Sequence, residues 1–223
     1  MIVVSILFFM YIITIGVFTF GYDSVHVFAP RELKPKTTFT LVIPFRNEEN
    51  NLPKLLESIR SLTYSKNLVE ILFIDDDSTD NSVKILDTFA KENTQINLIL
   101  LNNERSSNAP KKDAITTALK VANYKWVITT DADCILPKNW LKTFDNFIQQ
   151  NECNMVVAPV TYSTDKRFLH QFQLLDFLSL QASTVSGFGL QNPFLCNGAN
   201  LAYKKEIFEK VNGFENNNAI ASG

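Results

Sequence analysis

Residues 71–80 read Ile-Leu-Phe-Ile-Asp-Asp-Asp-Ser-Thr-Asp, four apolar residues that lead directly into an acidic loop. A short run of β-branched and aromatic residues is typical of a strand that is buried on both faces of a sheet. The residues that follow the loop, Ser82–Asn93, have apolar side chains at helical spacing. A buried strand, a polar loop and an amphipathic helix in this order predict an α/β protein with parallel strands.

The same pattern recurs on both sides of this stretch. Short apolar runs predict strands over Phe39–Ile43, Val69–Ile74, Ile96–Leu101 and Trp126–Thr130. Helix-period segments separate these runs, and the strands start about 30 residues apart, which is the length of a βαβ unit. The sequence therefore predicts a mostly parallel sheet in a three-layer α/β/α arrangement.

The first 22 residues have a different character. Ile2–Tyr22 contains no charged residue and consists mainly of Ile, Val, Leu, Phe and Met. A helix of this length rises about 30 Å, enough to cross the hydrocarbon core of a bilayer. The alternatives are a buried core helix and a cleaved signal peptide, but a signal peptide needs basic residues that Met1–Ser5 lacks. We therefore expect a transmembrane helix over residues 1–22.

The charges beside this helix predict its orientation. No Lys or Arg precedes it, whereas Arg31, Lys34 and Lys36 follow closely. Because positive residues flank the cytoplasmic side of a span, the rest of the chain is expected in the cytoplasm, anchored to the inner or plasma membrane. Residues 23–36 are interpreted as a juxtamembrane linker and residues 37–223 as one α/β domain.

Composition excludes several classes of function. The 21 Lys and Arg residues are balanced by 23 Asp and Glu residues, so a nucleic-acid partner is not expected. Cys134, Cys153 and Cys196 are scattered and form no C-x-x-C motif. They are interpreted as ordinary thiols in a reducing compartment, and two histidines are too few for a histidine-rich metal centre.

Acidic residues follow three of the predicted strands. The first strand leads into residues 44–49, the second into residues 75–80, and the fourth into Asp131-Ala132-Asp133. Ligands of open α/β sheets bind at the carboxyl ends of the strands, so these groups should share one edge. Clustered carboxylates repel unless a cation compensates, and Mg²⁺ or Mn²⁺ prefers such oxygen ligands together with substrate phosphates. The pattern predicts a divalent metal site for a phosphorylated substrate.

Each signal has a simpler explanation when taken alone. An isolated Asp-x-Asp is weak evidence, and the end of the Asp75–Asp80 loop could simply cap the helix that follows it. Lys111 and Lys112 could be solvated at the start of a helix, but positive charge is unfavourable there. A lysine at that position is better explained by an anion that faces it.

Four motifs, in this order, resemble those of family 2 glycosyltransferases with the GT-A fold, and the resemblance covers about Thr38 to Gly223. The motifs are Val42–Glu48, Ile74–Asp80, Thr130–Asp133 and Cys196–Tyr203. The N-terminal span and the aromatic-rich segment Phe168–Ser186 make the chain most similar to membrane-bound synthases of poly-N-acetylglucosamine and related polysaccharides. The resemblance implies transfer of a sugar from a nucleotide-sugar, with a UDP-sugar favoured, to a saccharide or lipid acceptor during synthesis of a cell-surface polysaccharide or glycolipid.

The resemblance also implies roles for individual residues. The donor nucleotide would be bound by Pro44, Arg46, Asn47, Glu48, Asp76, Lys112 and Asp131. Asp131 and Asp133 would hold Mg²⁺ or Mn²⁺, and Asp133 would be the more direct ligand. The pocket for the sugar and acceptor would be lined by Asn197, Gly198 and Asn200. Asp77 stands where the family usually has Gly or Asn.

The implied reaction is one displacement that inverts the anomeric centre. A divalent ion stabilises charge on the departing diphosphate, and a carboxylate takes the proton of the acceptor hydroxyl. In the family this base lies just after the segment that matches residues 219–223, so it is expected just after Gly223 and the chain is expected to be incomplete at its C-terminus. A later Q-x-x-R-W motif and C-terminal membrane helices are also absent. The carboxylates of Glu206, Glu209 and Glu215 are interpreted as surface charges.

Two other functions remain open. The missing base fits a non-catalytic, membrane-tethered fragment that binds a nucleotide-sugar. A receiver-like phosphoacceptor domain also groups aspartates and a lysine at strand ends. In such a domain the acidic pair should follow the first strand, however, whereas Asp75 and Asp76 follow the second.

Overall fold

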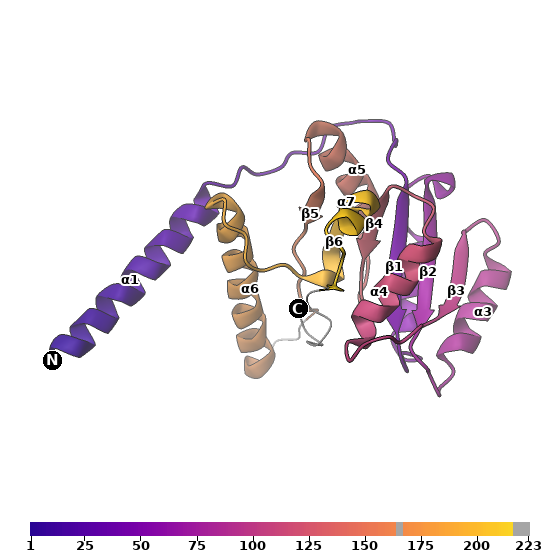
Figure 1. The fold of residues 1–223 in the computed structure, drawn as a ribbon, viewed down its shortest axis with the longest axis horizontal. Helices are drawn as coiled ribbons and strands as arrows, with labels where there is room; N and C mark the ends of the chain where they lie inside the picture. Colours follow the sequence, from indigo (N-terminus) through magenta and orange to yellow (C-terminus); the bar gives the residue numbers. More distant parts are fainter. Residues whose placement is uncertain (164–166, 216–223) are drawn as a thin grey trace. The chain divides into compact units, whose positions relative to one another are not determined.

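The computed structural model describes residues 1–163 and 167–215 (Figure 1). The described chain forms two compact units. One unit combines residues 1–29 with residues 158–197, and the other combines residues 30–157 with the residues from 198 onward.

The larger unit is built on one six-stranded sheet in the order β3-β2-β1-β4-β6-β5. The strands are β1 (Phe39–Phe45), β2 (Val69–Asp75), β3 (Leu98–Asn102), β4 (Trp126–Thr129), β5 (Met155–Val157) and β6 (Leu201–Lys204). β1 pairs in parallel with β2 and β4, and β2 pairs in parallel with β3, whereas β6 runs antiparallel to both β4 and β5. The predicted α/β class and mostly parallel sheet are confirmed, and the reversed strand β6 is an addition that the strand pattern did not indicate.

Helices cover both faces of this sheet. They are α2 (Leu52–Arg60), α3 (Ser82–Glu92), α4 (Pro110–Val121), α5 (Trp140–Gln150) and α7 (Lys205–Lys210), with short 3-10 turns η1 (Lys66–Leu68) and η2 (Gly198–Asn200). Val42 and Leu72 pack against Ala118 of α4 in one buried cluster. On the opposite face, Ile71 lies beside Ile59 of α2 and Leu141 of α5. Successive residues of a strand point to opposite faces, so a three-layer core follows from strands that are apolar at nearly every position.

The smaller unit contains two helices, α1 (Ile2–Asp23) and α6 (Phe168–Gly189). α1 is long and apolar enough to cross a membrane. The two helices touch where Gly189 meets Gly21, because a Cβ atom on Gly189 would lie 1.8 Å from the carbonyl oxygen of Gly21. The hydroxyl of Ser186 also donates to the carbonyl oxygen of Phe18 at 2.7 Å. Contact this close between two backbones requires glycine.

The segment before β1 is held to α5. The backbone N–H of Arg31 donates to Asn146 Oδ1 at 2.6 Å, and that of Thr37 donates to Asp145 Oδ1 at 2.9 Å. Asp145 and Asn146 are almost fully buried. Because buried polar groups are costly when unpaired, these two side chains fix the path of the chain into the sheet.

Candidate functional site

A cavity of about 440 Å³ lies at the carboxyl ends of β1, β2 and β4. Four carboxylates line it, Glu48 after β1, Asp76 after β2, and Asp131 and Asp133 after β4. The end of β1, the loop after it, the start of α4 and the loop after β4 supply the rest of the wall, with Pro44, Phe45, Arg46, Pro110, Lys111, Ala114 and Ala132. The predicted meeting of distant acidic segments at one edge of the sheet is therefore present, in a volume suited to a small-molecule ligand.

Asp76 accepts the strongest set of hydrogen bonds among the four carboxylates that line the cavity. Arg105 donates from Nε to Oδ1 and from Nη2 to Oδ2, both at 2.7 Å, and Asn103 Nδ2 donates to Oδ1 at 2.7 Å. Arg46 Nη1 lies 4.0 Å from Oδ2. Burial alone would raise the pKa of Asp76, but hydrogen bonds from Arg105 and Asn103, with the charges of Arg105 and Arg46, hold this pKa below its ordinary value.

The loop that carries Arg105 is itself anchored by a buried carboxylate. Asp113 of α4 accepts four hydrogen bonds, from the backbone N–H and the hydroxyl of both Ser106 and Ser107, at 2.9 to 3.1 Å. Burial opposes ionisation of Asp113, but these hydrogen bonds outweigh it and lower its pKa. Asp113 lies in the first turn of α4, where negative charge is also favourable. The guanidinium is thus positioned from α4.

Asn47 and Glu48 connect the first loop to the second. The N–H of Asn47 donates to the Ser78 hydroxyl at 3.0 Å, and Asn47 Oδ1 accepts from the N–H of Thr79 at 2.8 Å. The N–H of Glu48 donates to the Ser82 hydroxyl at 2.8 Å. Of these two predicted nucleotide-binding residues, Glu48 lines the cavity and Asn47 does not. In this structure Asn47 joins the loops after β1 and β2.

The second loop turns at Asp77, whose φ of 66° lies in the left-handed region. Gly and Asn adopt this region more readily than other residues. The backbone therefore gives a physical reason for the Gly or Asn that the family pattern has here, and Asp is among the side chains that tolerate the conformation. The end of the same loop also holds the start of α3, as the sequence predicted. Asp80 Oδ1 accepts a hydrogen bond from the backbone N–H of Ser82 at 2.9 Å.

The two lysines at the start of α4 have different environments. Lys111 lines the cavity, and its ammonium group forms an ion pair with Asp131. Lys112, the residue predicted near the donor, is buried and does not line the cavity; its ammonium nitrogen lies 5.7 Å from the centre of the Phe214 ring. Positive charge is unfavourable at the start of a helix, and at Lys111 the carboxylate of Asp131 offsets it. The sequence indicated that an anion would face a lysine at this position.

Asp131 and Asp133 are the groups that could hold a divalent ion. Within residues 1–163 and 167–215, no three His, Cys, Asp or Glu side chains form a ready-made ligand set. Mg²⁺ is nevertheless often held by one or two carboxylates together with substrate phosphates, so two carboxylates in an open cavity fit such an ion. The ion pair of Lys111 with Asp131 supports a cation site here, because the Asp131 carboxylate already holds a positively charged group.

The third predicted group is not part of the lining of this cavity. Gly198 and Asn200 belong to η2, where the Thr129 hydroxyl donates to the Gly198 carbonyl at 2.5 Å and Trp140 Nε1 donates to Asn200 Oδ1 at 2.9 Å. Asn197 is the last residue of the smaller unit. None of Asn197, Gly198 and Asn200 is among the described residues that line the cavity.

The acidic residues near the C-terminus are surface charges in the described part of the chain. Glu206 lies 3.5 Å from Lys125, and Glu209 lies 3.9 Å from Lys205. Glu215 is exposed. Residues 219–223, beside which the catalytic base is predicted, lie outside the described residues.

Sequence reasoning missed Arg105 and Asn103, which hold Asp76 although neither is among the described residues that line the cavity. A signal was available, because Asn102 and Asn103 follow directly on the third predicted strand. β3 lies next to β2 in the sheet, so its carboxyl end reaches the same edge. The polar residues after the third strand are therefore candidates for the same edge, although the spacing does not indicate which of them pair with Asp76.

Comparison with known proteins identifies the family. Residues 40–211 match the family model "Glycosyl transferase family 2". The poly(ribitol-phosphate) beta-glucosyltransferase of Bacillus spizizenii is 29% identical over 120 residues, 53% of this chain and 18% of that protein. The glycosyltransferase GlyG of Streptococcus pneumoniae is 27% identical over 119 residues, 53% of this chain and 38% of that protein. The chain thus spans well under half the length of these relatives.

Solved structures share the fold. The mannosyltransferase PcManGT from Pyrobaculum calidifontis, in complex with GDP-Man and Mn²⁺, superposes with a TM-score of 0.67 at 20% identity, over 91% of this chain and 56% of that one. TarS 1-349 of Staphylococcus aureus gives a TM-score of 0.56 at 20% identity, over 79% and 49%. The predicted GT-A fold is confirmed, and the receiver-like alternative is wrong. The chain belongs to glycosyl transferase family 2.

Proposed function

We propose that this chain is the donor-binding part of a glycosyltransferase that moves a sugar from a UDP-sugar to a hydroxyl acceptor with inversion at the anomeric carbon. The observation that carries the proposal is one cavity that holds Asp76 at one side and Lys111, Asp131 and Asp133 at the other. This arrangement offers a hydrogen-bonding site for a base and a charged site for a diphosphate.

The base would bind at Asp76 and Arg105. Each carboxylate oxygen has two lone pairs, so Asp76 can accept a further hydrogen bond beyond those from Arg105 and Asn103. A guanidinium has five N–H donors, and those of Arg105 that do not face Asp76 can bind a carbonyl oxygen. Asp76 and Arg105 together suit a base whose edge has an N–H group beside a C=O group. Uracil and guanine have such an edge, and adenine and cytosine lack it.

Relatives favour uracil over guanine. TarS, named poly(ribitol-phosphate) beta-N-acetylglucosaminyltransferase in Staphylococcus aureus, is 29% identical over 119 residues, and its 1-349 fragment has been solved with UDP-GlcNAc. PcManGT, solved with GDP-Man, shares the fold. The bases of both nucleotides have an N–H beside a C=O, which Asp76 and Arg105 could bind. TarS, the relative by sequence, favours UDP.

The diphosphate would lie against Lys111 and the two carboxylates after β4. Asp131 and Asp133 would hold Mg²⁺ or Mn²⁺, which when bound stabilises negative charge on the leaving diphosphate. Lys111 would exchange Asp131 for a phosphate oxygen, since both are anions within reach of one flexible side chain. Arg46, beside Asp76 and half exposed, adds positive charge to the same cavity.

We also propose the placement of the remaining parts. Residues 1–22 would anchor the protein in the cell membrane, residues 23–36 would link the anchor, and residues 37–223 would form the cytoplasmic catalytic domain. Arg31, Lys34 and Lys36 support this orientation. Asn197, Gly198 and Asn200 stay proposed for the sugar and acceptor, which would be a saccharide or lipid used in a cell-surface polysaccharide or glycolipid.

Calorimetry with a panel of nucleoside diphosphates tests the donor. With Mn²⁺ present, UDP should bind at least tenfold more tightly than CDP and ADP, with GDP next in order. Tighter binding of ADP or CDP than of UDP would contradict the proposed base site. Binding of UDP without any transfer from UDP-sugars, in the full-length gene product, would instead favour the non-catalytic alternative.

A further inference from the structure

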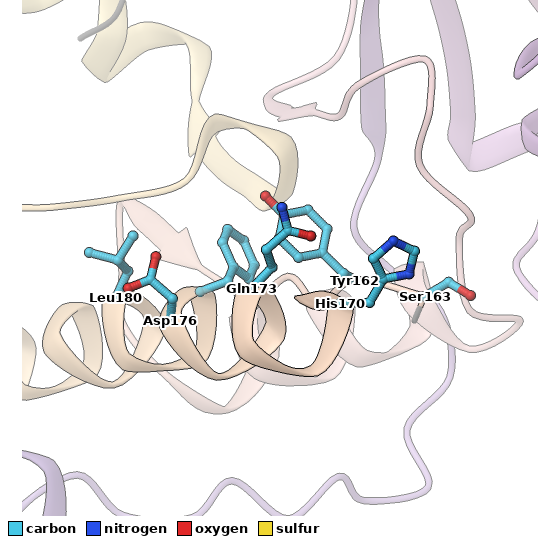
Figure 2. A pocket seen from close by; sticks show the side chains of 7 residues that line it. Tyr162, Ser163, His170, Gln173, Asp176 and Leu180 are labelled. Carbon is cyan, nitrogen blue, oxygen red and sulfur yellow. The ribbon is translucent and has the colours of Figure 1, made fainter. Parts of the chain in front are cut away.

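The smaller unit contains a second cavity, of about 440 Å³, on one flank of α6. The described residues that line it all lie between positions 162 and 180 and belong to this unit. Figure 2 shows His170, Gln173, Asp176 and Leu180 rising from the same side of the helix, and Tyr162 lines the same cavity. The segment before α6 is held in place by the N–H of Val160, which donates to Gln181 Oε1 at 3.4 Å.

An aromatic platform forms one wall of this second cavity. The rings of Tyr162 and Phe177 lie with centroids 4.4 Å apart and an angle of 37° between their planes. Tyr162 is 53% exposed, so much of its side chain remains open to a ligand. An aromatic face carries partial negative charge and attracts the weakly positive C–H groups of a flat ligand.

Polar groups face this platform at helical spacing. His170, Gln173 and Asp176 are three residues apart and share a flank of α6. A carboxylate accepts hydrogen bonds, an amide both donates and accepts, and an imidazole does either. Ligand hydroxyls need both donors and acceptors, and the Ser163 hydroxyl adds another group of this kind. Such a lining suits a ligand that is rich in hydroxyls and apolar on one face.

Charge narrows the ligand class further. None of the described residues that line the second cavity is Lys or Arg, and Asp176 is negative. An anionic group of a ligand, such as a lipid phosphate or a uronic acid, is disfavoured directly beside Asp176. A quaternary ammonium ion would suit Asp176 and the rings but could form no hydrogen bonds with the amide and hydroxyl groups. A neutral sugar satisfies all of them.

We propose that the α6 cavity is a binding site for a neutral saccharide chain. Only the identification of that chain as the acceptor of sugar transfer rests on the proposed function; the binding itself does not. The site would select neutral glycans over anionic ones by the charge of Asp176 and would orient them by stacking on Tyr162.

Saturation-transfer NMR on the full chain tests this proposal. The protein should be held in nanodiscs or a zwitterionic detergent, because maltoside detergents carry sugar headgroups. Cellotetraose and N-acetylchitotetraose are the neutral probes, a hyaluronan tetrasaccharide is the anionic probe, and choline is the cationic probe. At least one neutral probe should give signals, with ring C–H protons strongest, and its affinity should exceed that of the anionic probe at least tenfold.

Variants locate the binding. Tyr162→Ala and Asp176→Asn should each weaken the neutral probe at least fivefold, Tyr162→Phe should weaken it less, and Ser183→Ala, a change on α6 outside the cavity, should leave it unchanged. The proposal is overturned if neither neutral probe binds, if binding survives Tyr162→Ala and Asp176→Asn together, or if choline binds and the sugars do not. UDP affinity is measured in parallel, so that loss of the donor site is recognised separately.

Discussion

Arg105 and Asp76 form a two-point ion pair, with Nε–Oδ1 and Nη2–Oδ2 distances of 2.7 Å, at the carboxyl end of β2. Paired hydrogen bonds of this geometry fix the plane of a carboxylate as well as its charge. The two residues are 29 positions apart and come from loops after neighbouring strands. The base-reading part of the proposed site is therefore set by strand order.

Replacing Arg105 should weaken nucleotide binding. Arg105→Ala removes a charged donor pair, and hydrogen bonds to charged groups contribute about 1.5–3 kcal/mol, so UDP affinity should fall about tenfold or more. Arg105→Lys keeps the charge but cannot form the fork, and should recover only part of the loss. Calorimetric titration of UDP measures both. Equal affinity for wild type and Arg105→Ala would show that the guanidinium does not shape the base site.

The Arg105–Asp76 pair should also make stability depend on pH. The pKa of Asp76 is lowered in the folded state, so its ionised form stabilises the fold above the ordinary Asp pKa of about 3.9, and this contribution is lost as pH falls through the folded pKa. Asp76→Asn should therefore lower the urea midpoint at pH 7 and have a smaller effect at pH 3. A difference that stayed constant from pH 7 to pH 3 would mean that the Asp76 carboxylate does not titrate differently on unfolding.

Lys111→Met should change metal and nucleotide binding in opposite directions. Without donor, removing the ammonium frees Asp131 for a cation, so Mn²⁺ alone should bind about two- to fivefold more tightly, as expected for a half-exposed ion pair. UDP should bind more weakly, because its phosphates lose a positive partner. Mn²⁺ titration followed by electron paramagnetic resonance gives the first value and calorimetry the second. A loss in both would indicate damage to the cavity instead of an exchanged ion pair.

Asp77 offers a test of the backbone at the second loop. Asp77→Gly should preserve or raise the free energy of unfolding, whereas Asp77→Ala should be about 1 kcal/mol less stable than Asp77→Gly, because a Cβ atom disfavours positive φ. Asp87, exposed within α3, is the matched control, and there the Gly variant should be the less stable by about 1 kcal/mol. Urea unfolding gives all four values, and the same order at both positions would contradict the left-handed turn.

The contact between α1 and α6 can be tested with two glycines. Gly189→Ala places a Cβ atom against the Gly21 carbonyl and should lower the melting temperature and separate the helices. Gly16 of α1 is the control, because a Cβ atom there would meet no atom within 4 Å, and Gly16→Ala should have little effect. Cross-linking between cysteines introduced at Phe18 and Ser186 reports the contact directly. Unchanged cross-linking in Gly189→Ala would show that the helices do not meet there.

The central strands could be predicted from sequence because each is apolar at nearly every position. Phe39–Phe45 and Val69–Asp75 are buried along almost their whole length, so their pattern has no competing helical period. α6 gave a weaker signal, because Phe168–Gly189 has apolar residues all round and a single acidic residue, Asp176. Its polar residues His170, Gln173 and Asp176 share one flank, which the sequence pattern did not indicate because apolar residues surround them.

The acidic edge could also be predicted, but its partners could not. That β2 lies between β1 and β3 is a property of strand order, so the pairing of Asp76 with Arg105 could not be inferred from spacing. The choice between Lys111 and Lys112 depends on where α4 begins, because consecutive helical residues point about 100° apart. With α4 starting at Pro110, Lys111 faces the cavity and Lys112 is buried.

The most direct test of the account is UDP binding in Mn²⁺ and in EDTA for wild type, Asp76→Ala and Asp133→Ala. The account places the base at Asp76 and the metal-bound diphosphate at Asp133, so EDTA should weaken binding to wild type and Asp76→Ala but not to Asp133→Ala. Asp76→Ala should bind UDP more weakly than wild type in both conditions. A full Mn²⁺ response in Asp133→Ala, or unchanged affinity in Asp76→Ala, would contradict one nucleotide bound between these two carboxylates.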